Sequence, residues 1–293
     1  MPSGKRARQQ RQAAAAAVPP PVRSKGVGGA RARQASPRAL GIAGAVVLLV
    51  VIAIVLAVVL GRGGGSASSG TVSAADLHGL PAVGNQNWPG ALQGAGEAND
   101  LFKGIPQNGL ILGSPQAPVE MEMFIDVQCP VCQNYETTYL PTVVRQYIRT
   151  GKVQLHLQPW AFLGGAGSQS FSGRYGVIAA GAQNKAFQYA KVLYDNQGPE
   201  ESGWLDGQMM ANIAASVTGL RLDAWRADTN SSGARAVAAK VDKLAAKVGV
   251  TGTPTILVGC TGGKLHDIVG PTVAPNLQDT EQALNAAQSA CGK

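Results

Sequence analysis

Cysteine and histidine, the usual ligands of structural zinc, are scarce in this sequence, which has four cysteines and three histidines among 293 residues. A structural zinc site takes four such ligands, usually as two close pairs. Cys129 and Cys132 form one close pair, whereas Cys260 and Cys291 stand far apart and the histidines form no cluster. We therefore expect no metal site and no cofactor.

Acidic residues are missing from the start of the chain, and aromatic residues are few throughout, at 5%. Residues 1–38 hold nine of the 25 basic residues and none of the 17 acidic ones. The rest of the chain has 16 basic and 17 acidic side chains, so the net charge of +8 belongs to this tail. Because basic residues do not cluster beyond the tail, a nucleic-acid-binding globular domain is not indicated.

Charge is also missing from the segment Ala39 to Leu60, in which every residue is uncharged and most are apolar. As a helix this segment would span about 33 Å, enough to cross a bilayer core. The basic tail before it predicts a cytoplasmic N-terminus, with everything after Leu60 outside the cell membrane. We predict a retained single-pass anchor; the alternative is a cleaved signal peptide that ends near Ser66-Ala67-Ser68.

The main motif of the chain is a Cys-x-x-Cys that directly follows an apolar, strand-like run at 119–127. Pro130 then opens a helix at the position where its missing N–H costs nothing. The Cys129 sulfur would lie beside unpaired N–H groups and the positive end of the helix dipole, which stabilise a thiolate. Cys132 returns to the same face, within disulfide reach. These residues are the predicted catalytic pair, with Cys129 as nucleophile and Cys132 as the resolving thiol.

A second motif, Gly252-Thr253-Pro254-Thr255, follows about 120 residues later. With the Cys-x-x-Cys, it makes the chain from about Gly104 onward resemble the DsbA-like thiol:disulfide oxidoreductases of bacterial cell envelopes, in the thioredoxin-like superfamily. The resemblance implies an α/β thioredoxin-like fold with a helical insertion at about 165–248. It also implies a cis Pro254 that, with Thr253, binds an extended substrate beside the thiols. The implied partners are reduced exported proteins or peptides and a quinone-linked membrane protein of the DsbB or vitamin K epoxide reductase type.

Two positions depart from the pattern of that family. A carboxylate often stands six residues before the first cysteine, but here the position is Met123, with Glu120 and Glu122 on the opposite side of the strand. Asp126, three residues before Cys129, does match the DsbA-like pattern, and we interpret it as a loop residue near the helix start. Val131 replaces the histidine of the most oxidising members, so the helix N-terminus is the main group that stabilises the Cys129 thiolate. We therefore expect a milder oxidant than those members.

Cys260 and Cys291 are expected to form a structural disulfide. Cys260 ends the first strand of a predicted hairpin, and the final helix, opened by Pro275, runs back toward the hairpin turn. Cys291 stands seven residues after Leu284, on the buried stripe of that helix. All four cysteines lie after the apolar segment, and an even number in an oxidising compartment favours disulfides.

The expected organisation has four parts. They are a disordered basic cytoplasmic tail at 1–38, a transmembrane helix at 39–60, a linker and lead-in at 61–103, and a thioredoxin-like domain at 104–293. Expected strands are 110–112, 119–127, 153–158, 255–258 and 265–269, of which 153–158 is half-exposed because its apolar and polar residues alternate. Expected helices are 129–150 with a kink at Pro141, 171–194, 208–217, 223–228, 232–248 and one from Pro275 to about 290.

The leading hypothesis is a membrane-anchored, extracytoplasmic enzyme that forms disulfides in exported proteins. One rival is a disulfide reductase or isomerase, and another is a non-catalytic thioredoxin-fold scaffold that binds exported proteins. Two intact cysteines at the right spacing argue against the scaffold.

Overall fold

The computed structural model of the chain describes residues 71–165 and 167–291. Its centre is a six-stranded sheet with the strand order β1-β2-β4-β3-β5-β6. The central strand, β3 (Val119–Ile125), pairs in parallel with β4 (Val153–Pro159) and antiparallel with β5 (Thr255–Cys260). The outer strands are β1 (Gln107–Asn108), β2 (Ile111–Leu112) and β6 (Leu265–Asp267). This arrangement is the expected α/β, thioredoxin-like sheet.

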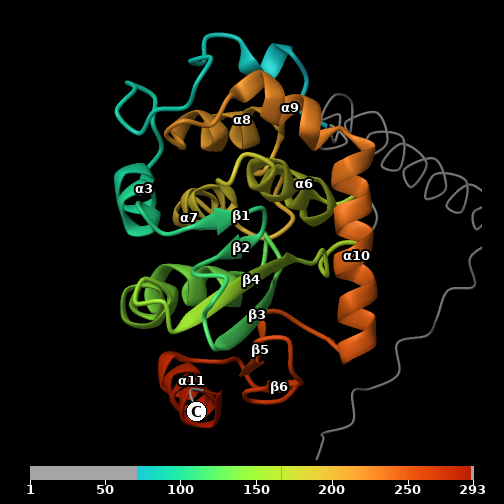
Figure 1. Ribbon diagram of the computed structural model, residues 1–293. Helices are drawn as coiled ribbons and strands as arrows, with labels where there is room; N and C mark the ends of the chain where they lie inside the picture. Colours follow the sequence, from blue (N-terminus) through green and yellow to red (C-terminus); the bar gives the residue numbers. More distant parts are fainter. Residues whose placement is uncertain (1–70, 166, 292–293) are drawn as a thin grey trace, which may run out of the picture. The chain divides into compact units, whose positions relative to one another are not determined.

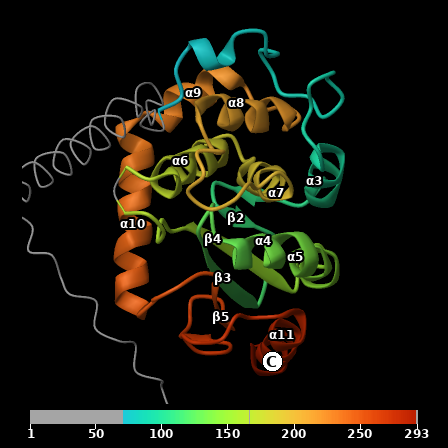
Figure 2. The same cartoon turned by 180° about the vertical axis from the view of Figure 1, so that it is seen from behind.

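Helices gather around this sheet at both ends (Figures 1 and 2). Beyond the β1–β2 end lie α6–α9, while α10 runs alongside the sheet and α11 packs on β5. Their bounds are α6 (Gln169–Gly181), α7 (Ala186–Asp195), α8 (Gly207–Ser216), α9 (Leu222–Thr229), α10 (Ser232–Val248) and α11 (Leu277–Cys291). The helices α6–α10 come between β4 and β5, which confirms the helical insertion predicted for about 165–248.

Alternation along β3 divides its side chains between the two faces of the sheet. Met121, Met123 and Ile125 are fully buried in the main apolar core, together with residues of the helices that follow Cys129. Each such side chain contributes about 1.5–3 kcal/mol of hydrophobic stabilisation when it is removed from water. Phe124, on the other face, packs in a second cluster with Ala245 of α10. The sheet is therefore covered on both sides.

The path from Pro130 to Ile148 is helical throughout, but its hydrogen-bonding pattern changes along the way. The short α-helices α4 (Pro130–Asn134) and α5 (Leu140–Val143) alternate with π-helical turns at Tyr135–Tyr139 and Val144–Ile148. Pro141 has no N–H to donate to the carbonyl four residues earlier, so the regular α-helical pattern cannot continue through it. A kink was expected at Pro141; what the structure shows is a change of helix type on either side of α5.

The single helix expected at 171–194 is wrong, because α6 and α7 are separate. Asn184 between them has a left-handed backbone, with φ 57°. Its side-chain oxygen accepts a hydrogen bond from the Gly109 N–H in the β1–β2 turn, at 2.9 Å. That long-range contact fixes the break, and a helical periodicity within one segment could not reveal it.

The half-exposed strand expected at 153–158 is also wrong in detail. Gln154 is buried, and His156 and Gln158 are partly buried, because the face that carries them is covered rather than open to water. The same face carries Glu120 and Glu122 from β3. A polar pattern within a strand therefore marks a polar interior surface in this protein.

The segment before residue 104 packs into the main core. Val72 and the inner residues of α3 (Ala95–Phe102) are buried there, and the Phe102 and Phe187 rings lie 5.8 Å apart. Trp88 packs against the same core. The packed part of the described chain thus begins well before the boundary expected at residue 104.

No helix within residues 71–165 or 167–291 is long and apolar enough to cross a membrane. The predicted transmembrane helix at 39–60 and the predicted tail at 1–38 lie outside the described residues.

Candidate active site

Cys129 is the N-cap residue of α4, directly after the strand β3 and a three-residue loop. Its extended backbone and the Pro130 ring at the first helical position start the helix, as the sequence predicted. The Cys132 N–H points back and donates a hydrogen bond to the Cys129 sulfur at 3.5 Å. Cys129 is 7% exposed and Cys132 is fully buried, so a reagent or protein in solution reaches only the first sulfur.

The two thiols differ strongly in acidity. The side chain of Cys132 and the backbone N–H groups at the helix start lower the pKa of Cys129 to about 6, although burial opposes the shift. Burial raises the pKa of Cys132, and the neighbouring Cys129 sulfur raises it further. At neutral pH the reduced site therefore holds a Cys129 thiolate beside a protonated Cys132. Such a pair can form and break a mixed disulfide at one sulfur and keep the other sheltered.

Thr253 and Pro254 lie against this pair, joined by a cis peptide bond. In its protonated form the Cys129 thiol donates to the Thr253 carbonyl oxygen at 3.3 Å, and the Thr253 hydroxyl is buried without a partner among the described residues. A groove of about 180 Å³ opens beside them. It is lined by Val131, Thr253, Pro254, Val269, Pro271 and Val273 among others. The structure thus brings together the two motifs that the sequence singled out.

Asp126 holds the loop that leads into Cys129. Its carboxylate accepts hydrogen bonds from the N–H groups of Phe162 and Leu163 at 2.7 and 2.8 Å and from the Ser170 hydroxyl at 2.6 Å. Its backbone oxygen accepts from the Tyr194 hydroxyl at 2.9 Å. The interpretation of Asp126 as a loop residue is confirmed, and its partners show that it fastens the active-site loop to the helical insertion.

Gln128, which the sequence analysis missed, is a second link between that loop and the insertion. Its side-chain oxygen accepts from the Glu201 N–H and the Trp204 indole, while its amide donates to the Glu201 carboxylate at 2.9 Å. Its backbone oxygen accepts from the Gln197 side chain at 2.8 Å. The position of Gln128, immediately before Cys129, was the signal in the sequence that could have identified it.

Glu136, also missed, is a fully buried carboxyl group four residues after Cys132. Burial raises its pKa to about 8, although the charge of Lys191 acts in the opposite direction. Lys191 is itself paired with Asp195 at 2.6 Å, and one oxygen of Glu136 has no partner in the described part of the chain. A buried acid thus lies one helical turn after Cys132, while the position six residues before Cys129 holds Met123.

The other two cysteines, Cys260 and Cys291, form the disulfide that the sequence predicted. Their Cα atoms are 5.4 Å apart, and the bond ties the end of β5 to the end of α11. Cys260 pairs with Val119, so the disulfide lies near the start of β3. Cys129, by contrast, follows the end of β3.

Comparisons with known proteins agree with this geometry. A family model described as thioredoxin matches residues 106–266. The probable disulfide bond formation protein D of Bacillus anthracis is 26% identical over 163 residues, which are 55% of this chain and 74% of that protein. The crystal structure of oxidised BdbD from Bacillus subtilis aligns with a TM-score of 0.53 at 18% identity, and covers 63% of this chain and 97% of that one. Wolbachia pipientis alpha-DsbA1 aligns with a TM-score of 0.51 at 18% identity, over 66% and 97%.

The family match, the curated relatives and the fold together show a DsbA-like thiol:disulfide oxidoreductase. Because the family model matches more than half of its residues, the chain belongs to the thioredoxin family.

Proposed function

We propose that this protein forms disulfide bonds in exported proteins, with Cys129 and Cys132 as its catalytic pair. The observation that carries the proposal is the difference between the two thiols, since the pKa of Cys129 is lowered to about 6 and that of Cys132 is raised. A low pKa makes Cys129 a good leaving group and stabilises the reduced form, which is the property of an oxidant. The exchange equilibrium therefore favours the reduced enzyme and the oxidised substrate.

The proposed reaction begins with the Cys129–Cys132 disulfide. A substrate thiolate attacks the Cys129 sulfur, the bond to Cys132 breaks, and Cys132 leaves and takes up a proton in its buried site. A second substrate thiolate then attacks the substrate sulfur of the mixed disulfide and releases Cys129 as a thiolate. The two substrate thiols together lose two electrons, and the enzyme disulfide gains them and is reduced to the Cys129 and Cys132 thiols.

Substrate binding is proposed at Thr253 and Pro254. The groove beside Cys129 gives an extended peptide room to lie along the backbone of these residues, as an added strand would. Val131, Val269 and Val273 line it together with the polar side chains of Thr255, Asp267 and Thr272, so the expected substrates are unfolded segments with an accessible cysteine.

The proposed location is outside the cytoplasm, with residues 39–60 as a single-pass anchor and residues 1–38 as a cytoplasmic tail. The sequence supports it through the apolar run that follows nine basic residues. Anchored there, the enzyme would be reoxidised by a quinone-linked membrane protein, which accepts the two electrons from Cys129 and Cys132. Residues 61–70 would connect the anchor to the packed part of the chain, in which Val72 is already buried.

Two assays in parallel test the direction of the reaction. The oxidised protein should restore activity to a reduced multi-disulfide substrate during refolding, and should reduce insulin slowly. Cys129→Ser should abolish both activities, whereas a Cys260→Ser and Cys291→Ser double variant should keep them. Fast insulin reduction without oxidative refolding would identify a reductase, and binding of unfolded substrate without either activity would identify a scaffold.

A further inference from the structure

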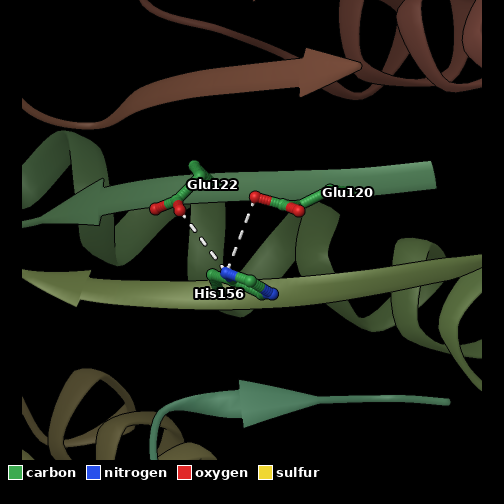
Figure 3. A group of neighbouring side chains, drawn as sticks. All are labelled: Glu120, Glu122 and His156. Carbon is green, nitrogen blue, oxygen red and sulfur yellow. Dashed lines mark ion pairs between the residues drawn. The ribbon is translucent and has the colours of Figure 1, made fainter. Parts of the chain in front are cut away.

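Three potential metal ligands meet on the polar face of the sheet, away from the cysteines. Glu120 and Glu122 extend from β3 toward His156 of β4, as Figure 3 shows. Parallel pairing places Glu122 directly beside His156. Glu120 lies two residues earlier on the same face, beside Gln154. One donor atom from each of the three residues lies within 4.8 Å of the other two. This is the one such group within residues 71–165 and 167–291.

The separations in this group are longer than those of a charge-assisted hydrogen bond. His156 Nδ1 lies 3.4 Å from an oxygen of Glu122 and 3.7 Å from an oxygen of Glu120. An imidazolium bound to a carboxylate would bring nitrogen and oxygen to about 2.7–2.9 Å. Two ligands at tetrahedral angles around Zn²⁺, with bonds of about 2.0–2.2 Å, are instead about 3.3–3.6 Å apart. The separation from Glu122 falls within this range and the separation from Glu120 lies just above it, so the donors leave room for an ion between them.

Each ligand is also held from behind by an atom that does not face the group. His156 Nε2 contacts the Gln154 side-chain oxygen at 3.3 Å, so a hydrogen on Nε2 leaves the Nδ1 lone pair toward the two carboxylates. The Gln158 amide donates to the second oxygen of Glu122 at 2.6 Å. The Gly262 N–H donates to the second oxygen of Glu120 at 3.2 Å. Such outer contacts fix the orientation of metal ligands in proteins.

The charge of the group is unbalanced without a cation. The three side chains are only 11–19% exposed, and two of them are carboxylates. No Lys or Arg among the described residues lies within ion-pair distance of Glu120 or Glu122. One divalent ion would match the charge of the two carboxylates, which have no Lys or Arg partner among the described residues.

We propose that Glu120, Glu122 and His156 bind one divalent transition-metal ion, with Zn²⁺ as the best fit. Imidazole nitrogen with carboxylate oxygens suits Zn²⁺, whereas Ca²⁺ and Mg²⁺ prefer oxygen ligands alone. Three protein ligands leave a fourth position for water on the partly exposed side. The ion would link β3 to β4 on the face opposite Met121 and Met123, and so act on stability rather than on thiol exchange.

The test is a Zn²⁺ titration of the full-length, tag-free chain after treatment with EDTA. The protein is kept oxidised so that Cys129 and Cys132, bonded to each other, do not bind Zn²⁺. We expect one Zn²⁺ per chain, a raised melting temperature with added Zn²⁺, and no displacement by excess Mg²⁺. His156→Gln and Glu122→Gln should each weaken binding by at least roughly tenfold. His266→Gln and Glu200→Gln, at exposed positions, are the matched controls and should bind as the parent does.

A measurement on the parent chain covers the case in which a variant does not fold. Co²⁺ in place of Zn²⁺ should give the visible absorption of a nitrogen–oxygen site, without a thiolate charge-transfer band. If the oxidised parent binds no Zn²⁺ and no Co²⁺, the group holds only a proton and the proposal is wrong. If the control variants lose binding as much as His156→Gln does, the ion is adventitious and the proposal is equally wrong.

Discussion

Cys129 and Cys132 begin α4 as two unbonded thiols, whereas Cys260 and Cys291 are bonded between β5 and α11. The first pair lies three residues apart at a helix N-terminus, where the pKa of one thiol is lowered to about 6 and that of the other is raised. The second pair is separated by 31 residues and closes a loop that includes β6 and most of α11. No comparable helix start stabilises a thiolate at either member of the second pair.

The difference shows that surroundings decide what a cysteine pair does. A disulfide that closes a short loop restrains the unfolded chain little, so its reduction costs little conformational stability. A disulfide that closes a long loop contributes much more to stability and resists reduction. We therefore assign exchange chemistry to Cys129 and Cys132 and a structural role to Cys260 and Cys291, and each prediction below tests that division.

The largest effect is expected from replacing single cysteines of the first pair. Cys129→Ser should reduce oxidative refolding to background, because no other exposed thiolate can take its place. Cys132→Ser should accumulate mixed disulfides with exported proteins, because no Cys132 thiol is left to attack the Cys129 sulfur of the mixed disulfide and release the substrate. Non-reducing gels followed by mass spectrometry identify the adducts. Adducts that appear with Cys129→Ser alone would reverse the two roles.

Removal of the second pair should affect stability instead of turnover. In the chain-entropy treatment, the loop closed by Cys260 and Cys291 corresponds to roughly 3–4 kcal/mol of stability. The double variant Cys260→Ser and Cys291→Ser should therefore unfold at a lower urea concentration by about that free energy, and still oxidise substrates at temperatures where it is folded. A double variant that is as stable as the parent but inactive would contradict the division.

The pH dependence of the first pair follows from the lowered pKa of Cys129. Alkylation of Cys129 by iodoacetamide should reach half of its maximal rate near pH 6, whereas free cysteine needs pH near 8.5. The reduced folded protein binds fewer protons at this thiol than the unfolded chain does between about pH 6 and 9. Its stability relative to Cys129→Ser should therefore rise with pH across that range, and be lost as the pH falls through 6.

The smallest effect is expected at Val131, which is 41% exposed and lines the groove beside Cys129. Val131→His should lower the pKa of Cys129 further and raise the reduction potential, because a positive charge or hydrogen bond would stabilise the thiolate. A rise of about 30 mV corresponds to a tenfold change in the equilibrium with glutathione. Val131→Thr, similar in size, serves as the control. An unchanged reduction potential would show that residue 131 does not set it, and Thr253 would be the next residue to test.

Much of the active site could be predicted because its signals are local. The Pro after Cys129 marks a helix start, and the Thr253-Pro254 motif is specific once it accompanies a Cys-x-x-Cys. The Cys260–Cys291 disulfide followed from the hairpin and the returning helix. The helix start depends on a short segment, whereas the place of Thr253 and Pro254 beside the thiols was implied by the resemblance to the DsbA-like family.

Features that depend on contacts between distant segments could not be predicted. Gln128 links the active-site loop to the helical insertion through Glu201 and Trp204, which lie more than 70 residues later; its place beside Cys129 marks the residue but does not indicate these partners. The break at Asn184 depends on the Gly109 N–H. His156 lies beside Glu122 only because β3 and β4 pair in parallel in this register. The histidines form no cluster in the sequence, so this group was not expected.

The central claim is that Cys129 and Cys132 act as an oxidant in the cell, and their redox state tests it most directly. Cells would be quenched with acid, free thiols alkylated, and the cysteine-containing peptides quantified by mass spectrometry before and after reduction. We expect Cys129 and Cys132 to be mostly oxidised at steady state, and to become reduced when the supply of oxidising equivalents is blocked, while Cys260 and Cys291 stay bonded throughout. A Cys129–Cys132 pair that is mostly reduced in untreated cells would contradict the oxidase assignment and identify a reductase.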